Sequence, residues 1–171
     1  KTLHPKVHGG ILAIRANESH QKQMAANDLK PIDLVIVNLY EFENTIAKEG
    51  CTLAQAIENI DIGGPTMLRA AAKNYKDVAV VIDPTDYAGL MEEIKTNSTI
   101  SQDTRFKLAV KVFNQTAKYD TAISSYLNLQ SANDNQPVFS EDSSVQISKV
   151  QDLRYGENPH QKAALYKEAG A

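Results

Sequence analysis

The chain has 171 residues, of which 42% are apolar and 23% charged, and this balance is typical of a folded globular protein. Its formal net charge is −3 and its lysines are scattered, which argues against a nucleic-acid partner. Cys51 is the single cysteine, no apolar run reaches the roughly 20 residues of a membrane span, and no signal peptide opens the chain. We therefore expect a cytoplasmic protein that binds neither nucleic acid nor membrane.

The opening residues, KTLHPKVHGG, contain no initiating Met, and we expect the sequence to begin partway through a domain. His4 and His8 have the spacing of two metal ligands on a helix, but Pro5 and the Gly9–Gly10 pair oppose a helix. We predict no metal site here. The Lys-Thr pair at the start suits phosphate binding in a loop, although both are also common surface residues.

A helix is indicated within residues 11–30, up to the break at Lys30–Pro31. The apolar run at residues 33–42, DLVIVNLYEF, predicts a buried strand of a parallel sheet. Asn38 and Tyr40 fall at its carboxyl end, where open parallel sheets bind ligands. The alternative is that Asn38 only caps the strand end and that Tyr40 packs with its hydroxyl in water.

Residues 52–60 predict a short helix capped by Thr52. The next stretch predicts a helix that begins at Gly64–Pro65 and ends at Lys73. Gly63 and Gly64 would leave backbone N–H groups open to an anion at the helix start. The alternative is that Asp61 caps the helix, that the glycines only make a tight turn, and that Lys73 complements the helix dipole.

A second buried strand is predicted at residues 77–82, followed by a helix with an acidic start at residues 83–97 and a long helix of roughly 40 Å from Ser101 to about Leu129. Strands that alternate with helices indicate an α/β fold with a mainly parallel sheet and flanking helices. Residues 130–146 have the composition of a linker, and the segment after this linker is too short to fold alone.

Five motifs, in this order, resemble the bifunctional enzymes of purine biosynthesis that join an IMP cyclohydrolase to an AICAR transformylase: KTLHPKVHGGIL, VNLYEF, IDIGGPTMLRAAAKN, FNQTAKYDTAISSYL and LRYGENPHQ. The resemblance covers nearly the whole chain. It implies that residues 1–148 are most of a methylglyoxal-synthase-like cyclohydrolase domain, and that residues 149–171 begin the transformylase domain. The family's first strand and early phosphate loop would precede this sequence, and the rest of the transformylase would come after it.

The resemblance also implies a cyclohydrolase site. Lys73 would move protons, Asp61 would orient the substrate carboxamide or accept its proton, and Tyr40 would donate a hydrogen bond to the formyl oxygen. Lys1 and Thr2 would bind phosphate, and the backbone of residues 37–38 and 61–62 would bind the base. The full set of implied substrate-binding residues is Lys1, Thr2, Val37, Asn38, Asp61, Ile62, Gly63 and Gly64. In the second domain, Arg154 and Tyr155 would contact the transformylase nucleotide.

The implied reaction closes the purine ring of formyl-AICAR (FAICAR) to give IMP and water, and it requires no cofactor or metal. The transformylase half would use 10-formyltetrahydrofolate as co-substrate, and the whole protein would be a homodimer. One alternative is a regulatory α/β module that binds a phosphate or nucleotide without catalysis, for which the set Tyr40, Asp61 and Lys73 is not needed. Another is a structural piece whose active site is incomplete.

Overall fold

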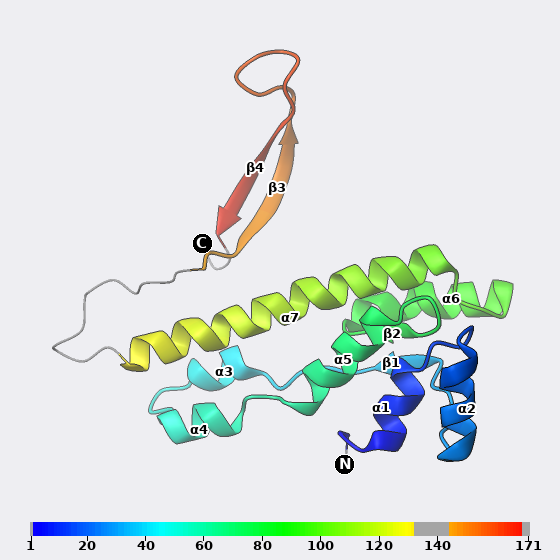
Figure 1. The fold of residues 1–171 in the computed structure, drawn as a ribbon. Helices are drawn as coiled ribbons and strands as arrows, with labels where there is room; N and C mark the ends of the chain where they lie inside the picture. The colour runs from blue at the N-terminus through cyan, green and yellow to red at the C-terminus, as the bar shows by residue number, and fades with distance from the viewer. Residues whose placement is uncertain (1, 132–143, 169–171) are drawn as a thin grey trace. The chain divides into compact units, whose positions relative to one another are not determined.

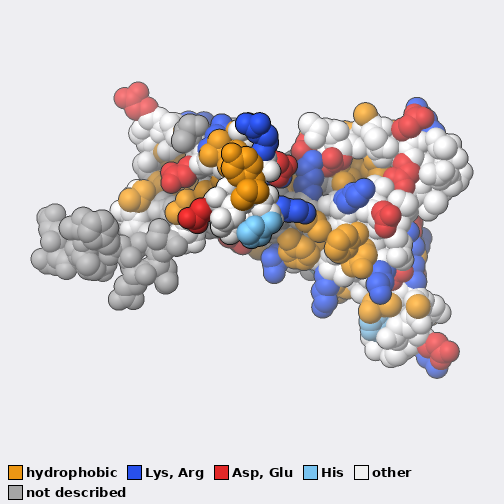
Figure 2. Space-filling model, turned by 90° about the horizontal axis from the view of Figure 1, so that it is seen from above, with side chains coloured by type: hydrophobic (Ala, Val, Ile, Leu, Met, Phe, Trp, Pro, Cys, Tyr) orange, Lys and Arg blue, Asp and Glu red, His pale blue; other side chains and the backbone are white. Residues whose placement is uncertain are grey.

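A computed structural model of the chain describes residues 2–131 and 144–168 (Figure 1). Lys1 and most of the predicted linker lie outside the described residues. The chain divides into two compact units, the first ending at Tyr119 and the second beginning at Asp120. Among the described residues, no helix is both long enough and apolar enough to cross a membrane. On the face drawn in Figure 2, basic and acidic side chains are interspersed.

The first unit contains a parallel pair of short strands, β1 (Leu34–Ile36) and β2 (Ala79–Val81), with Val35 opposite Val80. This pair confirms the α/β class predicted from the sequence. The strand expected over residues 33–42 is nevertheless wrong in its extent and burial. Ile36 is 50% exposed, the chain leaves the sheet after it, and Phe42 already begins a helix, α3 (Phe42–Ile46).

Helices cover both faces of this pair. Val80 packs in a cluster with Ile11 of α1 (Pro5–Leu12) and Leu68 of α5 (Gly63–Lys73). Val81 packs instead with Leu90 of α6 (Tyr87–Asn97) and Leu108 of α7 (Gln102–Ser131). Successive side chains of a strand point to opposite faces, so α1 and α5 lie on one face of the sheet and α6 on the other. The side of α7 that carries Val112 reaches the first cluster as well.

The helix α1 was not expected from the sequence. Pro5 is tolerated because it occupies the first turn, and the side chain of His4 accepts a hydrogen bond from the backbone N–H of Lys6 as the N-cap. The two glycines allow close packing: a Cβ at Gly9 would lie 2.7 Å from Leu29 Cδ1, and one at Gly10 would collide with the carbonyl oxygen of Lys30. The prediction that these residues exclude a helix was therefore wrong.

Apart from α3, which the sequence did not predict, the other helices follow the sequence pattern with shifted ends. The structure has α2 (Glu18–Ala26), which ends before the expected break at Lys30–Pro31, and α4 (Leu53–Glu58), with a capping box made by Thr52 and Gln55. A 3₁₀ turn, η1 (Pro84–Asp86), precedes α6. The 30 residues of α7 correspond to a length of about 45 Å.

The second unit contains an antiparallel hairpin of β3 (Ile147–Leu153) and β4 (Ala163–Glu168). Every residue of β3 is exposed, and an isolated hairpin is marginally stable in water. Arg154 and Tyr155 come directly after β3, and both side chains are exposed.

Asn74, directly after α5, ties the ends of α1 and α5 together. The residue is 8% exposed, and its side chain donates hydrogen bonds to the carbonyl oxygens of Ile11 (2.8 Å) and Ala13 (3.1 Å).

We predict that Asn74→Ala lowers the free energy of unfolding by about 1–3 kcal/mol, because buried carbonyl groups lose their donor. Urea denaturation measures this. Asn27→Ala, at an exposed helix end, is the control; an equal loss in both variants would contradict the prediction.

Candidate active site

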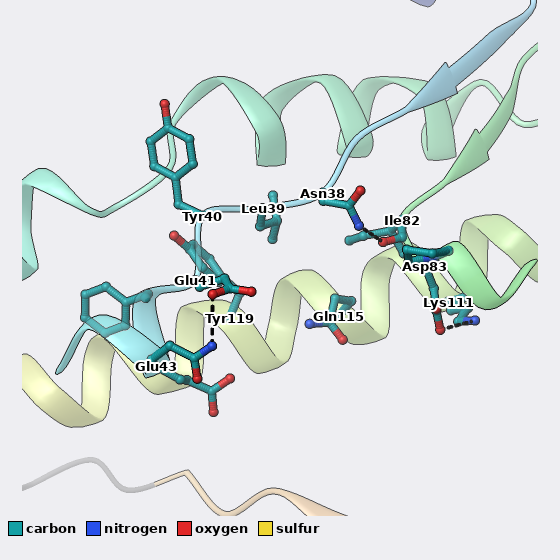
Figure 3. A pocket seen from close by; sticks show the side chains of 13 residues that line it. Asn38, Leu39, Tyr40, Glu41, Glu43, Ile82, Asp83, Lys111, Gln115 and Tyr119 are labelled. Carbon is teal, nitrogen blue, oxygen red and sulfur yellow. Dashed lines mark hydrogen bonds and ion pairs between the residues drawn. The ribbon is translucent and has the colours of Figure 1, made fainter. Parts of the chain in front are cut away.

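The carboxyl ends of β1 and β2 are held together by the residues that come after them. The backbone N–H of Val37 donates to the carbonyl oxygen of Val81 (3.0 Å), and the side-chain amide of Asn38 donates to the carbonyl oxygen of Ile82 (3.0 Å) (Figure 3). The loop after β1 is thus fixed at the sheet edge where parallel α/β proteins bind ligands. This bond gives Asn38 a structural role, as the strand-capping alternative expected.

Asp61 connects this loop to the start of α5. Its Oδ1 accepts a hydrogen bond from the backbone N–H of Gly64 (2.8 Å), and its Oδ2 accepts one from the backbone N–H of Tyr40 (3.3 Å). A negative charge at a helix N-terminus is also favoured by the helix dipole. The carboxylate is therefore oriented by two donors, one at the helix start and one that lies 21 residues earlier in the sequence.

Gly64 allows the close approach of Asp61 and Leu39 to this helix start. A Cβ at Gly64 would lie 2.6 Å from Asp61 Oδ2 and 2.9 Å from Leu39 Cδ2. The N–H of Gly64 is already used by Asp61, so the expectation that it stands open to a ligand is wrong for this structure. The alternative expected Asp61 to cap this helix. The N-cap position is Ile62, whose side chain makes no capping bond, but the Asp61 carboxylate does accept the N–H of Gly64 in the first helical turn.

Thr2 lies against the same helix start. A Cβ at Gly63 would collide with the Thr2 hydroxyl oxygen and lie 3.3 Å from Thr2 Cβ. The structure therefore brings together the Thr2 hydroxyl group and the backbone of Gly63 at the N-terminus of α5, beside the Asp61 carboxylate that already bonds the N–H of Gly64. Lys1, the residue before Thr2, lies outside the described residues. Ile62, between Asp61 and Gly63, has an exposed side chain.

Tyr40 and Lys73 are both accessible, but only Tyr40 lies near Asp61. The Tyr40 side chain is 60% exposed, and Figure 3 shows its phenol directed away from Gln115 and Lys111. Lys73 is exposed at the last position of α5, about 15 Å along the helix axis from Gly63. The structure does not bring Lys73 together with Asp61.

A pocket of about 340 Å³ lies beside the loop after β1, and the predicted site residues Asn38 and Tyr40 are among the residues that line it. It is bounded by that loop, by the end of β2 and by α7 (Figure 3). Its polar lining includes residues that sequence analysis did not select: Glu41, Glu43, Asn44, Asp83, Lys111, Gln115 and Tyr119.

Three of the missed residues share one face of α7, because Lys111, Gln115 and Tyr119 are spaced by four positions. That spacing is visible in the sequence, but which face of α7 meets the sheet edge is decided by packing. Asp83 could have been found, since it comes after the strand predicted at residues 77–82 just as Asn38 comes after the first strand.

Lys111 holds the end of β2 to α7. Its ammonium lies 2.7 Å from Asp83 Oδ2 and 2.8 Å from Asp86 Oδ2. The hydrogen bond from Lys111, together with that from the Thr85 backbone, lowers the pKa of Asp83 to about 2. Hydrogen bonds to Asp83 and then Asp86 raise the pKa of Lys111.

Tyr119 contributes a buried hydroxyl group beside Asp61. The backbone N–H of Asp61 donates to this hydroxyl (2.9 Å), which donates in turn to the carbonyl oxygen of Asn59 (3.3 Å). The Tyr119 ring also meets Phe42 edge to face, with ring centroids 6.3 Å apart. Among the described residues, no group of three His, Cys, Asp or Glu side chains is placed to hold a metal ion.

The first unit is a parallel α/β unit with polar groups at the carboxyl ends of its strands and at the start of α5. A family model described as MGS-like domain matches residues 1–66, which assigns this part of the chain to the class of MGS-like domains. A second model, described as AICARFT/IMPCHase bienzyme, matches residues 71–171. The chain belongs to the AICARFT/IMPCHase bienzyme family.

Curated relatives extend this similarity over the full chain. The chain is 59% identical over its whole length to the bifunctional purine biosynthesis protein PurH of Acetivibrio thermocellus and 56% identical to that of Ruminiclostridium cellulolyticum. It spans about a third (33%) of the length of these relatives. The crystal structure of ForH is similar with a TM-score of 0.70 and 34% identity, covering 78% of this chain and 68% of that one.

The Asp83–Lys111 pair makes stability depend on pH. A carboxyl group whose pKa is lowered on folding adds stability above its ordinary pKa of 3.8, and this contribution is lost as the pH falls through about 2. We predict that the free energy of unfolding falls more steeply from about pH 5 to about pH 2 in the parent chain than in Asp83→Asn or Lys111→Met. Urea titrations across this range measure the slopes, and equal slopes in the three proteins would contradict the prediction.

Proposed function

We propose that this chain provides the ring-closing site of a protein that converts FAICAR to IMP and water. The observation that carries the proposal is the Asp61 carboxylate, which two backbone N–H groups orient beside Tyr40 at the sheet edge. Membership of the AICARFT/IMPCHase bienzyme family supports the reaction class. Because the chain spans a third of its relatives, the activity belongs to the whole protein and is tested there.

The reaction joins two groups of one substrate. The carboxamide nitrogen attacks the formyl carbon, a C–N bond forms, and negative charge develops on the former formyl oxygen. The carboxamide nitrogen and the formamide nitrogen then give up one proton each, the bond between the former formyl carbon and its oxygen breaks, and the oxygen leaves as water. The protein must therefore hold a near-attack geometry, accept a proton and stabilise an oxyanion.

The residues at the helix start suit these tasks. Asp61 orients the carboxamide or accepts its proton, since its carboxylate is held by the N–H groups of Gly64 and Tyr40, and within the described part of the chain no lysine or arginine forms an ion pair with it. The exposed phenol of Tyr40 donates to the formyl oxygen as charge develops. The backbone of residues 37–38 and 61–62 binds the base.

The phosphate of the nucleotide binds at Thr2 and the start of α5. Thr2 lies against Gly63, so its hydroxyl group is placed to donate a hydrogen bond to a phosphate oxygen next to the helix start. Lys1, next to Thr2 in sequence, supplies the positive charge. Lys73 remains our candidate for proton movement, and its place at the far end of α5 makes its role a separate question from that of Asp61.

We extend the proposal to the whole protein. Residues 1–148 belong to the cyclohydrolase domain and residues 149–171 begin an AICAR transformylase that uses 10-formyltetrahydrofolate, with Arg154 and Tyr155 at its nucleotide. The protein acts in the cytoplasm as a homodimer. A regulatory module that only binds nucleotide is the second candidate, and the bienzyme family model favours the enzyme.

Asp61→Asn tests the central carboxylate. We predict a loss of about 10²- to 10⁴-fold in kcat for ring closure by the full-length protein, because a positioned acid–base group is removed while the side-chain shape is kept. Formation of IMP from FAICAR is followed by absorbance. Asp103→Asn, which removes an exposed acid from the first turn of α7, is the control and should retain the parental rate. A parental rate in Asp61→Asn would refute the role.

Lys73→Ala tests the lysine separately. If Lys73 moves protons, kcat falls by about 10²- to 10⁴-fold, and the pH dependence of kcat changes with it. Lys95→Ala, which removes an exposed cation from the last turn of α6, controls for the helix-dipole contribution. Ring closure at the parental rate would remove Lys73 from the mechanism and leave the residues at the start of α5 in place.

A further inference from the structure

The segment that carries Asp61 is fastened to α7 by the side chain of Tyr119. This residue is 6% exposed, and its hydroxyl group accepts the backbone N–H of Asp61 (2.9 Å) and donates to the carbonyl oxygen of Asn59 (3.3 Å). These two bonds lie between the end of α4 and the start of α5. The Tyr119 hydroxyl group therefore satisfies the backbone N–H of Asp61 and the carbonyl oxygen of Asn59, which in a helix or strand would be hydrogen-bonded to other backbone groups.

The same ring also supports the other segment that Asp61 joins. Phe42 is 1% exposed and meets the Tyr119 ring edge to face at an interplanar angle of 70°. Phe42 is two residues beyond Tyr40, whose backbone N–H binds Asp61 Oδ2. Both partners of the bond between Asp61 and Tyr40 are thus positioned against one residue of α7. A buried ring on a long helix is a rigid support, because packing fixes its rotamer.

We infer that Tyr119 is a positioning residue for the proposed ring closure, whose hydroxyl group holds the Asn59–Asp61 backbone and thereby aims the Asp61 carboxylate. The inference rests on the proposed function for its catalytic consequence, but the structural part stands without it. Tyr119 contacts the backbone of Asp61 and acts on the reaction through the position of that residue. Misplacing a reacting group by about 1 Å can cost on the order of 10²-fold in rate, so loss of this hydroxyl has a measurable effect.

The first experiment measures backbone protection, which does not depend on activity. Tyr119→Phe keeps the ring and its contact with Phe42 and removes only the hydroxyl group. In the full-length protein, hydrogen exchange of the peptide that covers residues 59–64 should become faster in Tyr119→Phe. Tyr75→Phe is the matched control, because Tyr75 is a partly buried tyrosine that likewise forms an edge-to-face pair, with Phe106. Unchanged exchange in Tyr119→Phe would overturn the inference.

The second experiment measures ring closure in a double-mutant cycle. We expect kcat to fall by about 10- to 100-fold in Tyr119→Phe with little change in KM, and to stay at the parental value in Tyr75→Phe. Because Tyr119 acts through Asp61, adding Tyr119→Phe to Asp61→Asn should cost little more. Parental kcat in Tyr119→Phe, or the same loss in both backgrounds, would overturn the inference.

The two readouts separate this inference from the proposed function. A full-length parent that closes no ring refutes the proposed function, while faster exchange of residues 59–64 still supports the structural part of the inference. Thermal unfolding of each variant identifies general destabilisation, in which case exchange becomes faster throughout the first unit. Such a global change would count against a local positioning role.

Discussion

The arrangement of the polar strand edge in the first unit depends on the carboxylate of Asp61. It accepts the N–H of Gly64 at the start of α5 and the N–H of Tyr40 in the loop after β1. Its own backbone N–H binds Tyr119 of α7. Three segments that are distant in the sequence therefore meet at one residue. A side chain at position 64 would displace this carboxylate, because its Cβ would lie 2.6 Å from Asp61 Oδ2.

The sheet edge itself is fixed by a second set of polar contacts. Asn38 binds the carbonyl oxygen of Ile82, so the ends of β1 and β2 are joined, and Lys111 holds Asp83, the next residue, to α7. The loop after β1 thus borders both the helix start with Thr2 and Asp61 and the pocket with Lys111 and Tyr119, and Tyr40 of this loop also lines the pocket. We place the chemistry at the helix start because the oriented Asp61 carboxylate lies there, with its bond to the backbone of the exposed Tyr40.

The sequence predicted the features that local chemistry determines. Apolar periodicity indicated the parallel α/β class and the long α7. The Gly64–Pro65 pair indicated the start of α5 to within one residue, and Thr52 indicated the start of α4. The helix α1 was missed because Gly9 and Gly10 serve contacts with Leu29 and Lys30, which only the folded chain reveals. Tyr119 and Lys111 were missed for a similar reason: their position on α7 becomes meaningful only when one face of that helix meets the sheet edge.

The most direct test of the proposed site is a crystal structure of the full-length protein with IMP bound. We predict that the phosphate lies against Thr2 and Gly63, and that the purine lies against Tyr40 and Asp61, with the Asp61–Gly64 bond intact. IMP bound in the pocket between the loop after β1 and α7, or away from Asp61 altogether, would contradict the proposal.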